Sequence, residues 1–351
     1  MNKRIILVAP AGGGKDFFRD YLIREQGLKA DVSLTTRPPR KGEVHGVTYH
    51  FTDDEEFNKL KESKKFYENV EFNGWQYGTL LNSWKKSDVF IMTPSGIKHL
   101  SEDDRMESFI VYFDIPVEDR IERLKLRSDA DSVVRRVEAD KKDFEGFSNY
   151  DLRITDPLFD CETLFQKIGD LEKVPSIHLD LDGVIFDYNQ HFLDYLGFED
   201  KTPAQSWHDP RFVDNFHKIA NDTNFWSTIP SIVSQEEVDL INKYVRGFIT
   251  ARTVPSEVSA AALKSIGIDV DSKTVITVGY EKTKIDCIKE LGVEMFLDDA
   301  VHNYEEINSN TNCLCYIKTR SHNESYFISP KFRFNNIHEF LNHCITKYSI
   351  G

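Results

Sequence analysis

Hydrophobic residues in this chain gather into short runs that polar, Gly-containing or Pro-containing segments separate. Two runs are each followed at once by a Gly-containing loop: RIILVAPAGGGK at 4–15 and SIHLDLDGVIF at 176–186. Each combination predicts the first strand of an α/β domain, and ligands of open parallel sheets bind beyond the carboxyl ends of the strands. The same pattern predicts further strands at 66–72, 89–93, 109–115, 246–251, 274–279 and 294–299.

Apolar residues recur at helical spacing at 156–172 and 255–267, between or beside these strands. The first of these segments leads through VPS into the second Gly-containing unit, which places a boundary near Lys173. At 351 residues the chain is also long for one core. We therefore expect two α/β domains, 1–172 and 173–351.

Composition narrows the class of protein. Hydrophobic residues make up 40% and charged residues 29%, as in ordinary globular chains. The net charge of -14 argues against bulk nucleic-acid binding. The five cysteines are scattered without a CxxC pair, and no apolar run approaches membrane-spanning length. We expect a cytoplasmic protein, in the host cytoplasm if it is viral, without a membrane partner; the oligomeric state stays open.

The first Gly-containing loop has the spacing of a phosphate-binding loop. Backbone N–H groups at Gly12, Gly13 and Gly14 can surround a phosphate at a helix N-terminus, and Lys15 can reach the β- and γ-phosphates of ATP. Asp16 stands where a Ser or Thr hydroxyl usually ligates magnesium. Its carboxylate could bind Mg²⁺ directly or repel the nucleotide.

Two downstream segments suit a nucleoside monophosphate: SLTTRPPRKGEVHGVTYHF at 33–51, with two arginines around prolines, and YENVEFNGWQYGTL at 67–80. Together they resemble the guanylate kinase family, whose monophosphate site has an S-x-T-T-R-x-P-R-x-G-E-x-x-G-x-x-Y-x-F block followed by E-F-x-x-x-x-Y-G-T. The resemblance implies a P-loop kinase with a parallel sheet and helices. It assigns the phosphate to Ser33, Arg37, Arg40, Tyr49 and Tyr77, and the base to Glu71 and Thr79.

The segment ERLKLRSDADSVVRRVEAD at 122–140 resembles the lid of that family. The resemblance implies that Arg123, Arg127 and Arg136 stabilise charge on the transferring phosphoryl group. The sequence departs from the family at 91–96, where IMTPSG replaces an acidic D-x-D-x-Q-G strand end. One carboxylate that helps to read guanine is missing there, so a different or modified purine or a deoxynucleotide is also a candidate substrate.

The second Gly-containing loop places Asp180 and Asp182 two residues apart, on one side of an extended chain. Such a pair can share a magnesium ion and a phosphate. One carboxylate then attacks phosphorus, while the other protonates the leaving oxygen and later activates water. Calcium loops of EF-hands also contain D-x-D-G, but their downstream ligands are absent from this sequence.

Thr250, Lys284, Asp298 and Asp299 follow in an order that resembles the four motifs of the haloacid dehalogenase superfamily. The resemblance implies a Rossmann-like domain with a small cap. It assigns Asp180 as nucleophile, Asp182 as acid and base, Thr250 and Lys284 as phosphate-binding residues, and magnesium to the four residues Asp180, Asp182, Asp298 and Asp299. Lys284 fits the family spacing better than the nearby Lys282.

Within that superfamily, DLDGVIFDYN, the segment FWSTIP at 225–230 and LDDAVHNYEEI look most like 5'-nucleotidases that act on deoxyribonucleotides. We expect Trp226 and His302 to be packing or cap residues. The sequence thus predicts a bifunctional enzyme that uses ATP and Mg²⁺. One domain would phosphorylate a purine (deoxy)nucleoside monophosphate, and the other would hydrolyse a phosphomonoester through an aspartyl phosphate.

Two alternatives remain open. Some enzymes that repair polynucleotide ends also join a P-loop kinase to a phosphatase of this class, although the net acidity and the monophosphate block disfavour that function. The first domain could also be a guanylate-kinase-like binding module with weakened catalysis, joined to an active phosphatase. Asp16 favours this second alternative, and Lys15 with the Gly-rich loop argues against it.

Overall fold

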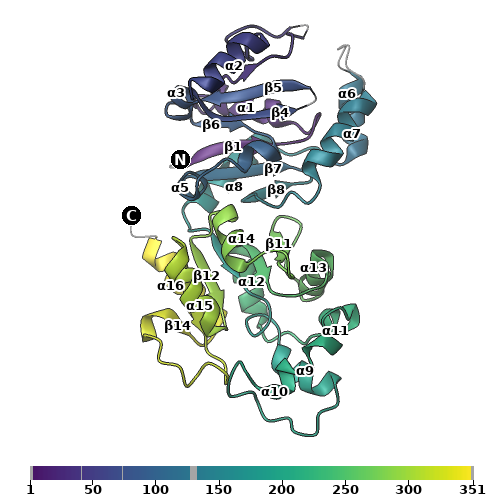
Figure 1. Cartoon of the computed structure of the whole chain (residues 1–351), viewed down its shortest axis with the longest axis vertical. Helices are drawn as coiled ribbons and strands as arrows, with labels where there is room; N and C mark the ends of the chain where they lie inside the picture. Colours follow the sequence, from purple (N-terminus) through teal and green to yellow (C-terminus); the bar gives the residue numbers. More distant parts are fainter. Residues whose placement is uncertain (1–2, 41, 73, 127–132, 349–351) are drawn as a thin grey trace. The chain divides into compact units, whose positions relative to one another are not determined.

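The computed structural model describes residues 3–40, 42–72, 74–126 and 133–348. The chain separates into two compact units, Met1–Ile168 and Gly169–Gly351 (Figure 1). The division falls inside helix α8 (Cys161–Glu172), slightly ahead of the position near Lys173 that the sequence suggested.

A four-stranded parallel sheet with the order β6-β1-β7-β8 forms the centre of the N-terminal unit. Its strands are β1 (Arg4–Val8), β6 (Val89–Ile91), β7 (Ser108–Phe113) and β8 (Leu152–Ile154). β1 is almost continuously hydrophobic because it lies between two neighbours and is covered on both faces. The helices that accompany this sheet, besides α8, are α1 (Lys15–Arg24), α4 (Pro94–Ile97), α5 (Glu102–Met106), α6 (Val117–Lys125) and α7 (Val133–Phe144).

A second sheet of the same unit has the order β3-β2-β5-β4. It consists of β2 (Leu34–Thr35), β3 (His50–Phe51), β4 (Phe66–Phe72) and β5 (Trp75–Leu80), with helices α2 (Asp54–Glu62) and α3 (Leu81–Trp84) beside it. β4 and β5 pair antiparallel along their length. The sequence predicted the β4 strand but not that it belongs to a separate sheet.

The C-terminal unit contains a six-stranded parallel sheet with the order β11-β10-β9-β12-β13-β14. The strands are β9 (Ile177–Leu179), β10 (Val245–Thr250), β11 (Thr274–Thr277), β12 (Met295–Asp298), β13 (Leu314–Lys318) and β14 (Arg333–Phe334). Counted along the chain, this is the doubly wound order 3-2-1-4-5-6. The order reverses between β9 and β12, and a ligand crevice is expected beyond their carboxyl ends.

Helices of the C-terminal unit fall into two groups. Those that connect the strands are α12 (Gln235–Tyr244), α13 (Ser256–Ser265), α14 (Lys284–Leu291) and α15 (Val301–Asn310), and α16 (Ile337–Tyr348) follows β14. A helical insertion between β9 and α12 contains α9 (Tyr188–Tyr195), α10 (Pro210–Val213) and α11 (Thr223–Ser227). Aromatic residues such as Phe192 and Phe225 are fully buried and hold this insertion together.

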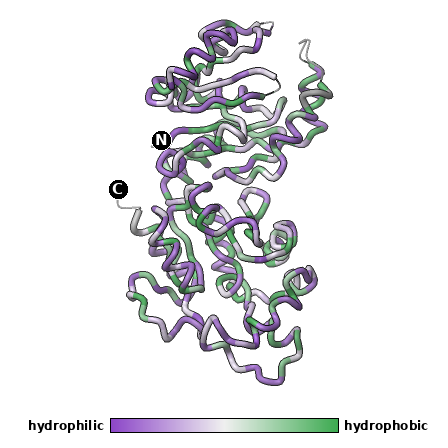
Figure 2. Tube along the Cα trace, in the orientation of Figure 1, coloured by the Kyte–Doolittle hydropathy of each residue, from purple (hydrophilic) through white to green (hydrophobic). Residues whose placement is uncertain are grey.

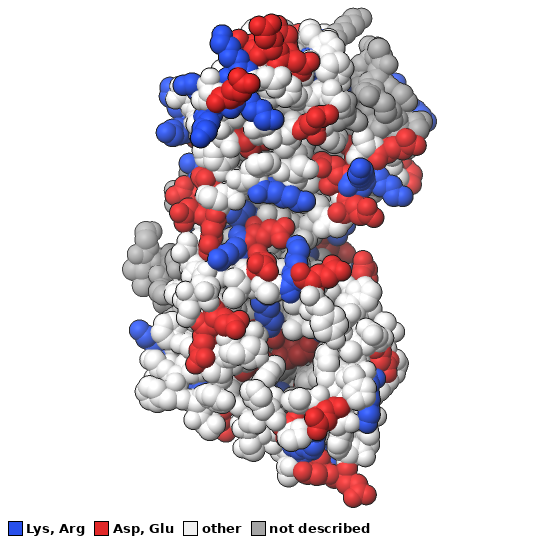
Figure 3. Space-filling view, viewed as in Figure 1, with Lys and Arg blue, Asp and Glu red and all other residues white. Residues whose placement is uncertain are grey.

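The hydrophobic and charged residues are distributed as this architecture requires. Hydrophobic residues concentrate on the central strands of both parallel sheets, and the helices alternate between hydrophobic and polar residues (Figure 2). Acidic and basic side chains are interspersed in small groups on the face drawn in Figure 3. Among the described residues, no helix combines the length and the hydropathy that crossing a membrane requires.

Candidate active sites

The Gly-rich loop connects the end of β1 to the start of α1. Gly14 caps α1 with a positive φ of 99°, and Gly12 has a φ of 81°, so both positions favour glycine. A side chain at Gly14 would also meet the Phe159 ring at 3.1 Å. The loop therefore brings backbone N–H groups and Lys15 to the N-terminus of α1, as a phosphate-binding loop requires.

Asp16 lies between two cationic side chains. Lys15 Nζ is 3.4 Å from Asp16 Oδ2, and Arg19 Nη1 donates to Asp16 Oδ1 at 3.3 Å. The carboxylate thus shares the charge of Lys15, and both residues line the cavity described next. Its role as a magnesium ligand stays a prediction.

A cavity of about 400 Å³ extends from this loop to the second sheet. Of the residues that the sequence assigned to nucleotide binding, its lining contains Gly12, Lys15, Asp16, Ser33, Arg37, Arg40, Tyr49 and Tyr77. Gly13 and Gly14 belong to the same loop but do not line the cavity. One space therefore adjoins both the phosphate loop and the arginine block.

Glu43, which the sequence reading passed over, fixes the arginine block. Arg37 Nη2 donates to both carboxylate oxygens of Glu43, at 2.8 and 2.9 Å, and the Arg40 backbone N–H donates to Glu43 at 2.7 Å. Burial alone would raise the pKa of Glu43, but the hydrogen bonds from Arg37 and Arg40 bring it below its ordinary value. Glu43 therefore stays ionised and orients Arg37 along the cavity wall.

The assignment of Glu71 to base binding stays a prediction; Glu71 is exposed, lies opposite Gln76 and is outside the cavity lining. Glu68 differs from Glu71 in position: it is 6% exposed, lines the cavity and accepts a hydrogen bond from the Thr79 hydroxyl at 2.9 Å. The two glutamates are three positions apart in β4, so they point to opposite faces of the strand.

Glu68 is suited to receive a donor from a ligand. Its Oε2 atom is buried and makes no hydrogen bond with the described residues. Burial raises the pKa of Glu68 above its ordinary value, and the Thr79 hydroxyl opposes that rise. Thr93, which replaces an acidic residue of the family, lines the same cavity, but its hydroxyl already accepts from the Gly96 N–H at 3.1 Å.

Only one of the three expected lid arginines can be placed with its side chain. Arg123 on α6 donates to the Gly12 carbonyl at 3.0 Å and to the Pro157 carbonyl at 2.5 Å. Arg127 lies outside the described residues, as does the side chain of Arg136 on α7.

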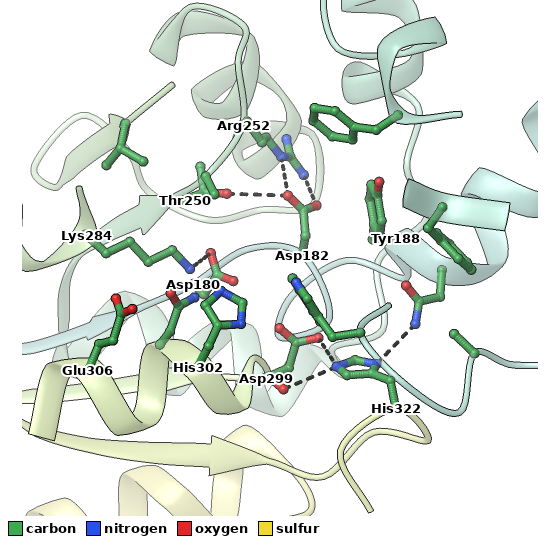
Figure 4. Close-up of a pocket in the computed structure, with 18 of the residues that line it drawn as sticks. Asp180, Asp182, Tyr188, Thr250, Arg252, Lys284, Asp299, His302, Glu306 and His322 are labelled. Carbon is green, nitrogen blue, oxygen red and sulfur yellow. Dashed lines mark hydrogen bonds and ion pairs between the residues drawn. The ribbon is translucent and has the colours of Figure 1, made fainter. Parts of the chain in front are cut away.

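The second candidate site lies at the carboxyl ends of β9 and β12, where the strand order of the C-terminal sheet reverses. Lys284 Nζ is 3.0 Å from Asp180 Oδ1 and 2.7 Å from Asp298 Oδ2. Ligand atoms of Asp180, Asp298 and Asp299 all lie within 4.8 Å of one another. Five residues that the sequence assigned to this site, Asp180, Asp182, Thr250, Lys284 and Asp299, line one cavity of about 490 Å³ (Figure 4).

The charges at this site are strongly coupled. Burial raises the pKa of Asp180 well above its ordinary value; Lys284 opposes the rise, and Asp298 and Asp299 add to it. Burial would lower the pKa of Lys284, but the carboxylates of Asp180 and Asp298 outweigh it and raise that pKa. Lys284 therefore remains a cation among three carboxylates.

The three carboxylates fit a hard cation. Asp299 Oδ1 is buried and makes no hydrogen bond with the described residues, and three carboxylate groups exceed the charge of the one lysine between them. Oxygen ligands of this kind are those that Mg²⁺ prefers. The Asp182 carboxylate, expected among the metal ligands, is not part of this cluster.

Asp182 instead pairs with Arg252, a residue that the sequence reading missed. Arg252 donates from Nε and Nη2 to the two oxygens of Asp182, at 2.9 and 2.8 Å, while the Thr250 hydroxyl is 3.4 Å away (Figure 4). Arg252 is 1% exposed, and its guanidinium carbon lies 5.0 Å from the centre of the Phe186 ring and 5.1 Å from that of the Trp226 ring. Its position two residues after Thr250 was the only signal in the sequence.

Two further residues support the carboxylate cluster from outside. Asn303 donates to Asp298 Oδ2 at 3.0 Å, and His322 Nε2 is 3.1 Å from Asp299 Oδ2. His322 Nδ1 in turn contacts the Asn189 amide of the helical insertion at 3.2 Å. His302, expected to pack, lines the cavity and contacts the Trp207 ring.

The N-terminal unit, with a Gly-rich loop between a parallel strand and a helix and an arginine-lined cavity beside it, defines a P-loop nucleotide-binding protein. The family model for guanylate kinase matches residues 1–168. A guanylate kinase of Nostoc sp. is 31% identical over 169 residues, which cover 45% of this chain and 84% of that protein. The chain therefore belongs to the guanylate kinase family.

Other guanylate kinases are also similar to the chain. One from Mesorhizobium japonicum is 28% identical over 200 residues, which cover 54% of this chain and 91% of that protein. The crystal structure of guanylate kinase from Anaplasma phagocytophilum has 22% sequence identity, covers 49% of this chain and 85% of that chain, and has a TM-score of 0.38.

Proposed function

We propose that the chain is a bifunctional nucleotide enzyme. The N-terminal unit phosphorylates a purine (deoxy)nucleoside monophosphate such as GMP or dGMP with ATP, and the C-terminal unit is a magnesium-dependent phosphatase of the haloacid dehalogenase type. Membership of the guanylate kinase family supports the first activity. The carboxylate cluster around Lys284 supports the second.

The observation that carries the kinase proposal is the single cavity that adjoins both the phosphate loop and the arginine block. Phosphoryl transfer needs donor and acceptor phosphates in line and their charge stabilised, and little covalent chemistry from the protein. Lys15 and the loop N–H groups would hold the donor phosphates, while Arg37 and Arg40 would hold the acceptor phosphate. The acceptor oxygen then attacks the γ-phosphorus as the bond to ADP breaks.

Base recognition in this proposal rests on Glu68 and Thr79. The free Oε2 atom of Glu68 can accept one N–H from the base edge. Thr93 offers a hydroxyl where the family has a carboxylate, so a purine with fewer donors than guanine could also bind. A panel of nucleoside monophosphates therefore has to include modified and deoxy forms.

The observation that carries the phosphatase proposal is the position of Asp180 beside Lys284 at the end of β9. Asp180 Oδ attacks phosphorus, the ester bond breaks, and the leaving oxygen takes a proton from Asp182. Asp182 then takes a proton from water, which attacks the phosphoryl group and releases phosphate from Asp180. Mg²⁺ held by Asp180, Asp298 and Asp299 would supply positive charge against the phosphate dianion.

The lining of the second cavity favours a mononucleotide over a polynucleotide end. Its only Lys and Arg residues among those described are Lys284 and Arg252, and both are engaged in ion pairs. Tyr188, Phe212 and Trp226 provide an apolar wall instead. A polynucleotide would present further phosphates that find no cation in this lining.

ATP consumption against a panel of nucleoside monophosphates tests the kinase, and release of phosphate from the same panel, with and without a chelator of Mg²⁺, tests the phosphatase. We expect Lys15→Ala to abolish only the first activity and Asp180→Asn only the second. Binding of a monophosphate without ATP turnover would instead establish the weakened binding module. Faster release from a 5'- or 3'-phosphorylated oligonucleotide than from any mononucleotide would establish end repair.

A further inference from the structure

The Gly-rich loop is attached to both helices of the lid at one residue, Ala11. Asp140 on α7 accepts a hydrogen bond from the Ala11 N–H at 2.8 Å. Arg120 on α6 donates to the Ala11 carbonyl at 3.3 Å, and its Nη1 also lies 3.4 Å from Asp140 Oδ2. The backbone N–H and the backbone carbonyl of Ala11 are thus both held by one ion pair, Arg120–Asp140, which joins α6 to α7.

Burial of this ion pair costs free energy, because both charged groups lose their hydration. Arg120 is 9% and Asp140 4% exposed, and Arg120 Nε is further fixed by the Ile115 carbonyl at 3.0 Å. A buried pair of this kind contributes little net stability compared with apolar residues of similar size. Burial raises the pKa of Asp140, and the Ala11 N–H and Arg120 oppose that rise, so both contacts favour the ionised carboxylate.

The arrangement fixes the direction of the loop's peptide groups. The peptide bond between Ala11 and Gly12 is trans, so its C=O and N–H point in opposite directions. Because Arg120 holds the Ala11 carbonyl, the Gly12 N–H is turned away from Arg120. Arg123 holds the next carbonyl, that of Gly12, in the same manner at 3.0 Å.

We propose that Arg120 and Asp140 are positioning residues for the donor nucleotide: they hold the loop carbonyls away from the phosphates and keep the loop in the shape that binds ATP. This inference rests on the proposed kinase function. Ala11, Gly12, Lys15 and Asp140 all line the same cavity, so the ion pair adjoins the space in which the donor phosphates would bind. It also ties the base of the lid to the loop, because α6 and α7 carry the candidate arginines.

The test is the binding of ATP to the full chain by calorimetry, together with the KM for GMP, in four proteins: the parent, Asp140→Ala, Asp140→Asn and Asp143→Asn. Asp143 is a matched control because it lies on the same helix, bonds to Ser95 and does not line the cavity. We expect Asp140→Ala to raise the dissociation constant for ATP about tenfold, as the loss of one charge-assisted hydrogen bond predicts. The KM of Asp140→Ala for GMP should stay within about twofold of the parent, below the roughly tenfold effect of one such bond. In Asp143→Asn, both the dissociation constant for ATP and the KM for GMP should stay within about the same twofold range.

Asp140→Asn distinguishes positioning from a general effect on folding. Its amide oxygen can still accept from the Ala11 N–H, so we expect it to restore most of the ATP affinity that Asp140→Ala loses. The proposal is overturned if Asp140→Ala binds ATP as well as the parent or more tightly. It is also overturned if Asp140→Asn and Asp140→Ala both weaken ATP binding and raise the KM for GMP to the same extent. Failure of the parent to bind ATP would refute the kinase function itself, whereas a fully active Asp140→Ala protein would refute only the role of this ion pair.

Discussion

Arg252 holds both carboxylate oxygens of Asp182, although the two residues lie 70 positions apart in the chain. The Arg252 side chain is fully buried, whereas Asp182 keeps a side-chain exposure of 18% toward the cavity. The guanidinium therefore fixes the direction of the proposed acid and base from its protein side and leaves the other side open to substrate.

The first prediction concerns Arg252. Arg252→Met should destabilise the C-terminal unit by about 3 kcal/mol, the lower end for breaking a buried pair because Asp182 can still reach solvent. Arg252→Lys retains the charge but loses the two parallel hydrogen bonds, so its phosphatase turnover should fall with a smaller loss of stability. Thermal unfolding and turnover of a phosphate ester measure the two effects. Unchanged turnover in both variants would remove Arg252 from the site.

Base recognition gives the second prediction, with a control in the same strand. Glu68→Gln should raise the KM for GMP by at least about tenfold, because a charged acceptor facing the base is lost. Glu71→Gln should leave the KM within about twofold of the parent, since Glu71 is exposed outside the cavity. Steady-state kinetics of both variants over the nucleotide panel measure these KM values. Equal effects would mean that the cavity is not the base site.

The difference between Glu68 and Glu71 shows what the sequence could and could not predict. The motif located the strand and the hairpin partner Thr79, and β4 does form at 66–72. It could not tell which glutamate faces inward, because that depends on the pairing of Glu68 with Thr79. Glu71, the residue that the motif indicated, lies three positions from Glu68 and therefore on the other face of β4.

The second site shows the same limit at longer range. Asp180, Thr250 and Asp298 lie at or directly after strand ends, and Lys284 begins the helix that follows β11. Because parallel strands bring their carboxyl ends together, the cluster could be predicted. Partners that pack from the side, such as Arg252 and His322, carry no local pattern. Their roles depend on burial and on the helical insertion, which only the structure shows.

The third prediction concerns Asp16, which lies 3.4 Å from Lys15. If its carboxylate takes the magnesium role, Asp16→Ala should lower kinase turnover and raise the Mg²⁺ concentration for half-maximal activity, by about tenfold for one lost charged ligand contact. The kinase turnover and the Mg²⁺ requirement of Asp16→Ser should then lie between those of Asp16→Ala and the parent. A large gain of activity in Asp16→Ser would show instead that Asp16 competes with the phosphates for Lys15 and weakens the kinase.

The last prediction concerns Asp180, whose neighbours indicate which activity a substitution there should remove. As the nucleophile it must approach phosphorus as an anion, and Lys284, 3.0 Å away, lowers the repulsion between that anion and the phosphate. Asp180→Asn keeps the shape of the side chain but removes the nucleophile. We expect it to lose nearly all phosphatase turnover, to retain kinase activity and still to bind a phosphate ester.

Two comparisons separate this role from a purely structural one. Asp271→Asn, at an exposed carboxylate paired with Lys264, should leave both activities unchanged. Asp182→Asn should also be severely impaired, but less so in the first step when the substrate has a good leaving group that needs no proton. Rapid acid quenching of the parent with a labelled nucleotide should trap an acyl phosphate on Asp180. Full phosphatase activity in Asp180→Asn, or phosphatase activity that persists when Mg²⁺ is chelated, would show that the reaction does not pass through this carboxylate. In the proposed reaction steps, no other group forms the bond to phosphorus.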